Sequence, residues 1–154
     1  MRLYSLQKEP SPADQQQLQA LLQTQSNVHD LRIHLHDFVD TAALIQQLDL
    51  VIAVDTAIAH LAGALGKPVW LLLPSAPDWR WMQQRHDSPW YPTMRLFRQP
   101  AYGDWKSVMT QLREALGEKR QKVEGKRQSA VSGQRSAVCK PSANAYREAS
   151  DSDQ

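Results

Sequence analysis

The chain of 154 residues, 42% hydrophobic and 22% charged, is long enough for one globular domain and too short for two of ordinary size. Its net charge of +2 is too small to argue for a nucleic-acid partner, and no apolar run approaches the roughly 18–20 residues that span a bilayer. The single Cys139 excludes an internal disulfide and fits a reducing compartment. Because Met1–Pro10 also lacks the apolar middle of a signal peptide, we expect a cytoplasmic protein.

Strands and helices are expected to alternate along the chain. Alternating patterns and apolar runs predict strands at residues 2–7, 31–36, 50–54, 69–73 and 94–97. Caps and helical spacing predict helices at 11–24, from Asp40 or Thr41 to 48, and at 58–65, 78–85 and 105–116. Leu50–Val54 is apolar throughout, which is typical of a parallel strand buried on both faces. We therefore predict an α/β fold, with a Rossmann-like parallel sheet and helices on both of its faces.

The composition changes after about Gly117, where Lys, Arg, Gln and Ser predominate. We expect a folded domain over residues 1–117, then a helix extension and a disordered basic and polar tail over 118–154, because so few apolar residues cannot offset the ordering entropy. A tail that touches nucleic acid is the alternative to a solvated tail. The solvated tail is the one we expect, so no nucleic-acid partner is predicted.

The turn from Asp55 to His60 lies between an apolar strand and a helix rich in small residues. Ligands of parallel sheets bind beyond the carboxyl ends of the strands, and the free N–H groups of a helix start attract phosphate. Thr56 can cap that helix, and Ala57 and Ala59 leave room for an approaching ligand. His60 can point back toward the same end and donate to a phosphate oxygen, and Gly63 permits the helix to pack closely on the sheet. The alternative is an ordinary capped helix with a surface histidine.

Several motifs resemble, in the same order, those of family 9 glycosyltransferases, the heptosyltransferase-like enzymes. The central one is Asp49–Pro74, where family members have a D-[ST]-G-x-x-H turn and this chain has Ala57 in place of the glycine. The others are Tyr4–Lys8, Asp37–Leu48, Pro77–Trp81, Ser88–Pro92 and Met94–Gln99. The resemblance covers about residues 2–116. It implies the carboxyl-terminal, donor-binding half of a two-domain GT-B fold, of the kind that follows tetratricopeptide repeats in bacterial proteins.

The resemblance implies that Asp55, Thr56, Ala57 and His60 receive the diphosphate of a nucleotide-sugar donor. It also places Lys8 near the phosphates, where an ordinary exposed lysine is the alternative. For Asp37, contact with the base or ribose and simple helix capping stay equally open.

Further candidates follow the fourth predicted strand, where Arg80 could bind phosphate in a bidentate manner. Trp79 and Trp81 cannot share a helix face, so one of the two should pack inward. The alternative is that this cluster only closes the edge of the sheet. His34 and His36 would share a strand face but have no convincing third ligand, so neither a metal site nor a cofactor is predicted.

We hypothesise a truncated glycosyltransferase that binds a nucleotide diphosphate sugar but lacks its acceptor domain, because the first strand follows Met1 at once. No general base is identified, and the domain should be inactive alone. The alternatives are a non-catalytic nucleotide-binding or protein-interaction module partnered with a repeat protein, and a broken gene product. A flavodoxin-like or response-regulator domain is less well supported, since Asp55 lacks acidic partners after the first strand.

Overall fold

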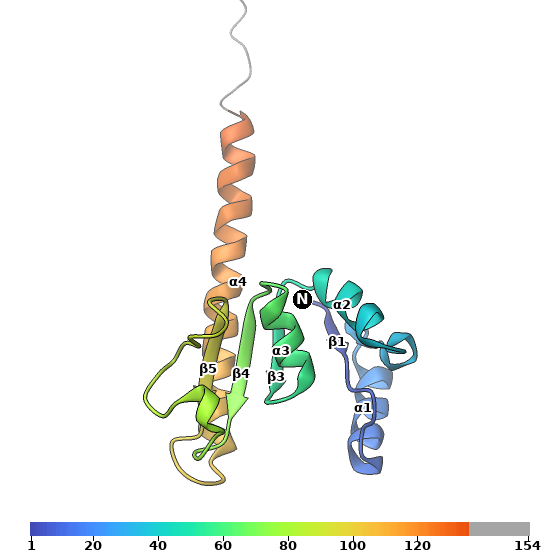
Figure 1. Ribbon diagram of the computed structural model, residues 1–154. Coiled ribbons are helices and arrows are strands. Elements are labelled where there is room, and N and C mark those ends of the chain that lie inside the picture. Colours follow the sequence, from blue (N-terminus) through green and yellow to red (C-terminus); the bar gives the residue numbers. More distant parts are fainter. Residues whose placement is uncertain (136–154) are drawn as a thin grey trace, which may run out of the picture. The chain divides into compact units, whose positions relative to one another are not determined.

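The computed structural model describes the backbone of residues 1–135 and side chains as far as residue 126. It forms two compact units, Met1–Met109 and the stretch that begins at Thr110. Figure 1 shows the elements in chain order, and the strands belong to the first unit. They are β1 Leu3–Ser5, α1 Pro12–Thr24, β2 Val28–Asp30, the 3-10 helix η1 Arg32–His34, α2 Phe38–Gln46, β3 Val51–Val54, α3 Ala57–Ala64, β4 Val69–Leu73, the 3-10 helix η2 Trp79–Trp81, β5 Met94–Arg98 and α4 Trp105–Arg135.

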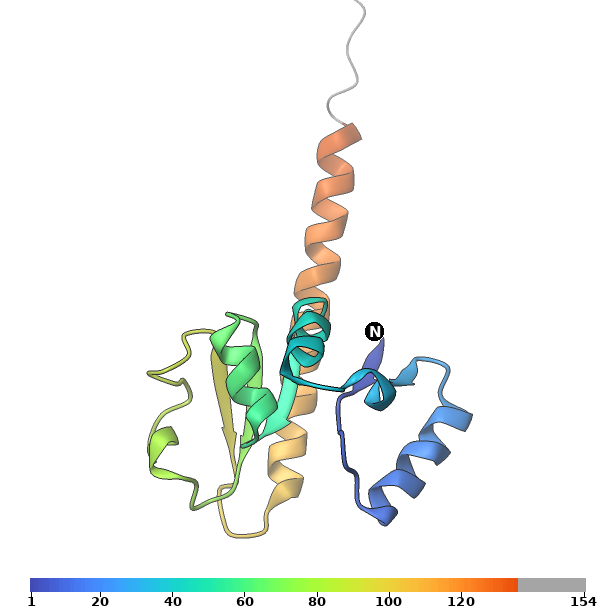
Figure 2. The same cartoon turned by 45° about the vertical axis from the view of Figure 1, so that its right-hand side comes forward.

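The strands form two parallel sheets, and this confirms the predicted α/β class. One sheet pairs β1 with β2, and the other has the order β3-β4-β5. In the larger sheet Val51 lies opposite Val69, and Val69 lies opposite Met94. Helix α3 contacts β3 and β4, and it lies across one face of this sheet in Figures 1 and 2. Parallel pairing needs such a crossover between consecutive strands, and α3 supplies it between β3 and β4.

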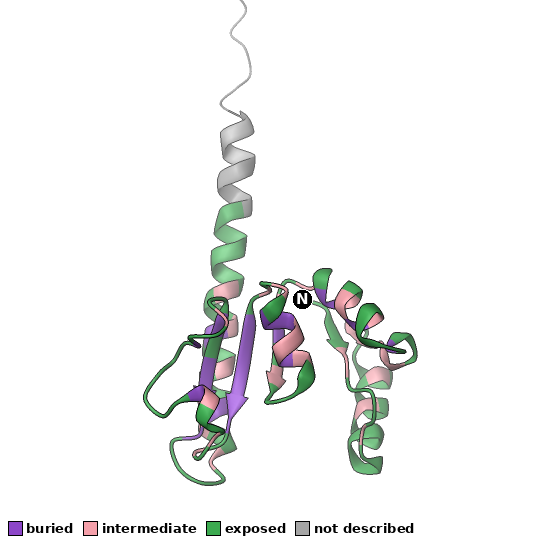
Figure 3. Cartoon of the chain, in the orientation of Figure 1, coloured by how far each residue is buried: buried purple, intermediate pink, exposed green. Residues whose placement is uncertain are grey.

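The hydrophobic core is centred on β4, in which all five residues are buried because strands flank it on both sides. Figure 3 shows the buried residues concentrated on this sheet. The cluster of buried residues contains Ile45, Val51, Ala59, Ala62, Val69, Leu71, Leu73, Trp81, Met94 and Leu96. The prediction that the third strand is buried on both faces is wrong. Ile52 and Val54 are 38% and 49% exposed, since β3 lies at an edge of this sheet.

The predicted strand at residues 31–36 is also wrong, because β2 ends at Asp30. The N–H of Leu31 still donates to the carbonyl of Ser5, but Asp30 Oδ1 then accepts from the N–H of Arg32 and turns the chain into η1. Ile33 is consequently 71% exposed whereas Leu35 is buried. The apolar alternation in this segment therefore reflects one buried side chain after a turn, that of Leu35, and not the face of a strand.

Caps explain where several helices begin and end. Ser11 Oγ accepts from the N–H of Asp14 at the start of α1, as predicted. Helix α2 begins earlier than predicted, because Asp37 and not Asp40 or Thr41 is its cap. After α3, Gly66 has a φ of 68°, a left-handed conformation that costs glycine little, and the helix ends there as predicted.

The last two predicted helices differ from the observed ones in length. Only the short η2 forms within residues 78–85, and Met82 with a φ of 50° follows it directly. Helix α4 runs from Trp105 to Arg135, beyond the predicted end of the last helix at Leu116 and into the segment expected to hold a helix extension. The predicted disordered tail falls, from residue 136 on, outside the described residues.

Candidate functional site

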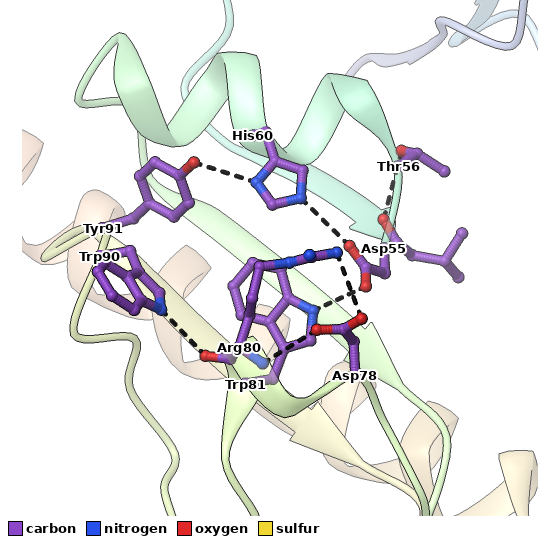
Figure 4. Close-up of polar contacts among 9 residues, drawn as sticks. Asp55, Thr56, His60, Asp78, Arg80, Trp81, Trp90 and Tyr91 are labelled. Carbon is purple, nitrogen blue, oxygen red and sulfur yellow. Dashed lines mark hydrogen bonds and ion pairs between the residues drawn. The ribbon is translucent and has the colours of Figure 1, made fainter.

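The turn between β3 and α3 places Asp55 and Thr56 beyond the carboxyl end of a parallel strand. Val54 is the last residue of β3, and α3 begins at Ala57. Figure 4 shows Asp55 between the imidazole of His60 and the indole of Trp81. The structure therefore brings together two of the predicted site residues, Asp55 and His60, through direct side-chain contact.

Asp55 ties this turn to η2 through a buried indole. Trp81 Nε1 donates to Asp55 Oδ2 over 2.8 Å, and the Trp81 side chain has no exposed surface. A buried indole N–H needs an acceptor, because it would otherwise lose the hydrogen bond that it makes in water. Asp55 therefore satisfies Trp81, and the hydrogen bond holds the carboxylate beside the start of α3.

His60 contacts protein groups through both ring nitrogens. Nε2 lies 3.3 Å from Asp55 Oδ1, and Nδ1 lies 3.0 Å from the hydroxyl of Tyr91. The imidazole also stacks on Trp81, with ring centroids 5.3 Å apart and an interplanar angle of 28°. Its Nε2 edge faces Asp55, in the direction that the sequence predicted, while Tyr91 and Trp81 hold the ring in place.

Thr56 does not play the capping role that the sequence predicted. Its Oγ1 donates to the carbonyl of Val54 over 3.3 Å, and the Thr56 side chain forms no cap hydrogen bond at the start of α3. Asp55, the residue before Thr56, does not replace it as a cap, because its carboxylate accepts from Trp81 and not from the backbone of α3. In the first turn of this helix the N–H of Ala59 donates to the carbonyl of Thr56 over 3.0 Å. The N–H groups of Ala57 and Ile58 are then the ones that have no intrahelical partner, as is general at a helix start.

Gly63 makes room for Tyr91 and not, as predicted, for the sheet. A Cβ atom added at Gly63 would lie 2.6 Å from Tyr91 Cγ and 2.7 Å from Tyr91 Cδ1. The backbone of Tyr91 is held in turn, because its carbonyl accepts from the N–H of Met94 over 3.0 Å. Close packing of Tyr91 on α3 therefore places its hydroxyl beside His60.

Lys8 and Asp37 make their contacts around the start of α2. Lys8 Nζ donates to the carbonyl of His36 over 2.9 Å. The ammonium thus binds the residue that directly precedes Asp37. Asp37 Oδ1 accepts from the N–H groups of Val39 and Asp40, at 2.8 and 2.9 Å. Capping is thus the role that the structure gives to Asp37. A ligand that bound Lys8 would share its ammonium group with the carbonyl of His36.

Arg80 lies on η2, next to the Asp55 turn. Its guanidinium pairs with Asp78 at 3.4 Å and lies 5.9 Å from the ring centroid of Trp79. Among the described residues, Arg80 Nε is a buried donor without a hydrogen-bond partner. The prediction that one tryptophan packs inward is confirmed, since Trp81 is buried and Trp79 is 73% exposed.

Sequence reasoning missed the link from Trp81 and Tyr91 to the site. Both lie in motifs of the family resemblance, Pro77–Trp81 and Ser88–Pro92, but nothing in their spacing from Asp55 or His60 indicates contact. Trp90 strengthens the same region, because its Nε1 donates to the carbonyl of Arg80 over 3.1 Å. Three segments that are distant in sequence therefore converge on the imidazole.

The ionisable groups with shifted pKa values support the surrounding loops. Burial lowers the pKa of the Arg98 guanidinium, which donates to the carbonyl of Trp81. A side-chain hydrogen bond from Arg85 lowers the pKa of Asp87 in the loop before β5. Hydrogen bonds from the hydroxyl and the N–H of Ser107 lower the pKa of Asp104 at the start of α4.

Comparison with known proteins identifies the family. The model of glycosyltransferase family 9 (heptosyltransferase) matches residues 11–114, which is more than half of the chain. The chain belongs to glycosyltransferase family 9. This family 9 chain is also similar to the protein FlbA of Caulobacter vibrioides, with 39% identity over 80 residues. That similarity covers 52% of this chain and 13% of FlbA, so the chain matches only a small share of its relative.

No solved structure matches this family 9 chain significantly. Along the described part of the chain, His, Cys, Asp and Glu side chains do not gather in groups of three or more that could hold a metal ion. Of the helices that the structure describes, none has both the length and the apolar character needed to cross a membrane.

Proposed function

We propose that this family 9 domain binds the diphosphate of a nucleotide-sugar donor at the start of α3. The observation that carries the proposal is the first turn of that helix, where the side chain of the cap residue Thr56 makes no hydrogen bond to the helix backbone. Acidic residues before a helix commonly accept from these N–H groups, but the carboxylate of Asp55 is held by Trp81. The N–H groups of Ala57 and Ile58 and the positive end of the helix dipole are then available to an anion.

The side chains around this turn suit a phosphate group. Nε2 of His60 faces the same end of α3, and a phosphate oxygen could share its proton with Asp55. Thr56 can turn its hydroxyl from the carbonyl of Val54 toward a ligand, since the 3.3 Å bond between them is long for an O–H donor. Arg80, whose Nε lacks a partner among the described residues, would supply a positive charge by a change of side-chain rotamer.

Lys8 and Asp37 complete the proposal at a second position, near the start of α2. Lys8 keeps donors beyond the one that it gives to His36, and it would contact phosphate, while Oδ2 of Asp37 would contact the ribose or the base. We further propose that these residues form the donor half of a two-domain GT-B transferase. The acceptor site and the general base would then belong to the other domain of that fold.

Titration with ADP, GDP and UDP, followed by calorimetry or by fluorescence of the five tryptophans, tests donor binding. We expect His60→Ala to weaken binding about 10- to 100-fold, which is the effect of losing a hydrogen bond to a charged group. Thr56→Val should weaken it a few-fold, as for a neutral hydrogen bond. His86→Ala and Thr24→Val are matched controls, because both side chains are exposed and, within the described residues, neither is hydrogen-bonded to the turn. Absence of binding by all three nucleotides would refute the proposal.

A protein-interaction module is the second candidate function. Ile33, Phe38 and Val39 are 71%, 65% and 75% exposed, and all three lie between β2 and the first turn of α2. Large apolar side chains that gather on a surface often mark a contact with another protein. This function would be favoured if the chain bound no nucleotide but bound a repeat protein, and if Phe38→Asp weakened that complex.

A further inference from the structure

Tyr91 is held tightly against the imidazole of His60. Its ring packs on Gly63, where no side chain intervenes, and its centroid lies 5.8 Å from that of His60 in an edge arrangement. The hydroxyl reaches Nδ1 at 3.0 Å, and Figure 4 shows this bond on the side of the ring away from Asp55. Packing and hydrogen bonding therefore act together on one edge of the imidazole.

The groups on either side of His60 determine where its proton lies. A carboxylate oxygen can only accept, so the favourable arrangement places the proton on Nε2, 3.3 Å from Asp55 Oδ1. In the neutral imidazole Nδ1 is then an acceptor, and the hydroxyl of Tyr91 is the donor that it faces. Trp81 Nε1 keeps the carboxylate in position by donating to its other oxygen.

The contact between His60 and Asp55 leaves the Nε2 proton available to a ligand. At 3.3 Å it is longer than the roughly 2.7–2.9 Å of a charge-assisted hydrogen bond. It also faces the uncapped start of α3, where the proposed diphosphate would lie. A histidine with its proton on Nδ1 instead would present a lone pair to this anion and repel it.

We propose that Tyr91 is a positioning residue for the diphosphate site, because its hydroxyl keeps His60 oriented with the proton on Nε2. The role in ligand binding rests on the proposed function, whereas the state of the imidazole can be measured without a ligand. Tyr91 does not itself contact the donor. Its contribution to affinity passes through His60.

Nitrogen-15 NMR of the imidazole, recorded on the free protein at about pH 8, tests the first step. We expect the wild type to show a protonated Nε2 and an Nδ1 that accepts a hydrogen bond. Tyr91→Phe, which keeps the ring on Gly63, should shift the Nδ1 resonance and reduce the preference for one tautomer. Tyr102→Phe is the matched control, since Tyr102 is 96% exposed. A proton on Nδ1 in the wild type, or an unchanged spectrum in Tyr91→Phe, would overturn the proposal.

Nucleotide titration tests the second step. Tyr91→Phe should weaken the binding of ADP, GDP or UDP about five-fold, the effect of one hydrogen bond, and Tyr102→Phe should not. In a His60→Ala background the effect of Tyr91→Phe should disappear, which a merely structural role would not produce. An equal loss in both backgrounds would refute positioning through His60 while donor binding stands. A wild type that binds no nucleotide would instead overturn the donor site, and with it the role of Tyr91 toward a ligand.

Discussion

Replacement of Gly63 by alanine should destabilise the domain, although alanine normally stabilises a helix. The added Cβ would lie 2.6 and 2.7 Å from two ring carbons of Tyr91, whereas carbon atoms in contact prefer about 3.5–4.0 Å. The ring must therefore move by about 1 Å, against the hydrogen bond between its hydroxyl and His60, while the N–H of Met94 holds the backbone carbonyl of Tyr91 in place. Overpacking of this kind costs about 1–3 kcal/mol. The better helix propensity of alanine offsets about 1 kcal/mol of that cost.

We thus expect the free energy of unfolding of Gly63→Ala to fall by about 0–2 kcal/mol, measured by urea denaturation and tryptophan fluorescence. The decisive comparison uses Tyr91→Ala, where the ring is gone and only the Cβ atom of residue 91 remains near the added atom. In that background Gly63→Ala should stabilise the domain by about 1 kcal/mol, so the sign of the effect reverses.

Gly117→Ala is the control for propensity alone, because nothing lies within 4 Å of a Cβ at that helical position. It should not lower the free energy of unfolding. If Gly63→Ala stabilised the protein equally with and without the Tyr91 ring, the packing of Tyr91 on α3 would be refuted.

Two further predictions concern caps of other helices. Asp37→Ala removes the acceptor for the N–H groups of Val39 and Asp40, so it should lower the free energy of unfolding by about 0.5–2 kcal/mol. Asp37→Asn should retain most of the stability that Asp37→Ala loses, because an amide oxygen also accepts from the helix N–H groups. Equal losses in the two variants would contradict the capping role. For Asp104, hydrogen bonds from Ser107 lower the pKa of the folded state, so its contribution to stability is present above the unfolded value of about 3.9. The advantage of the wild type over Asp104→Ala should therefore shrink as the pH falls through the lower, folded value, and an advantage that is constant into strong acid would contradict this.

The sequence was informative wherever a pattern is local. The apolar run at Val69–Leu73 indicated a buried strand, and Ser11 and Gly66 indicated helix ends, because caps and runs depend on neighbouring residues only. It was misleading at Leu31–Leu35, where the apolar alternation mimics a strand. The side chain of Asp30 competes there for the backbone and turns it into η1.

The exposure of β3 shows a second limit of prediction from sequence patterns. Its apolar residues predict a strand covered on both faces, yet the exposure of Ile52 and Val54 depends on which strands lie beside β3. Edge and central strands of a parallel sheet can have the same composition, so only the sheet order distinguishes them.

By itself the sequence determined the parallel α/β order, the position of the turn at Asp55–His60 at the end of a strand, and the likeness to family 9 that the comparison then established. Only the tertiary structure decided what holds that turn. Trp81 lies 26 residues from Asp55 and Tyr91 lies 31 residues from His60, so no local pattern could pair them. Their contacts arise because parallel strands place successive loops at one edge of the sheet, where side chains that are distant in sequence meet.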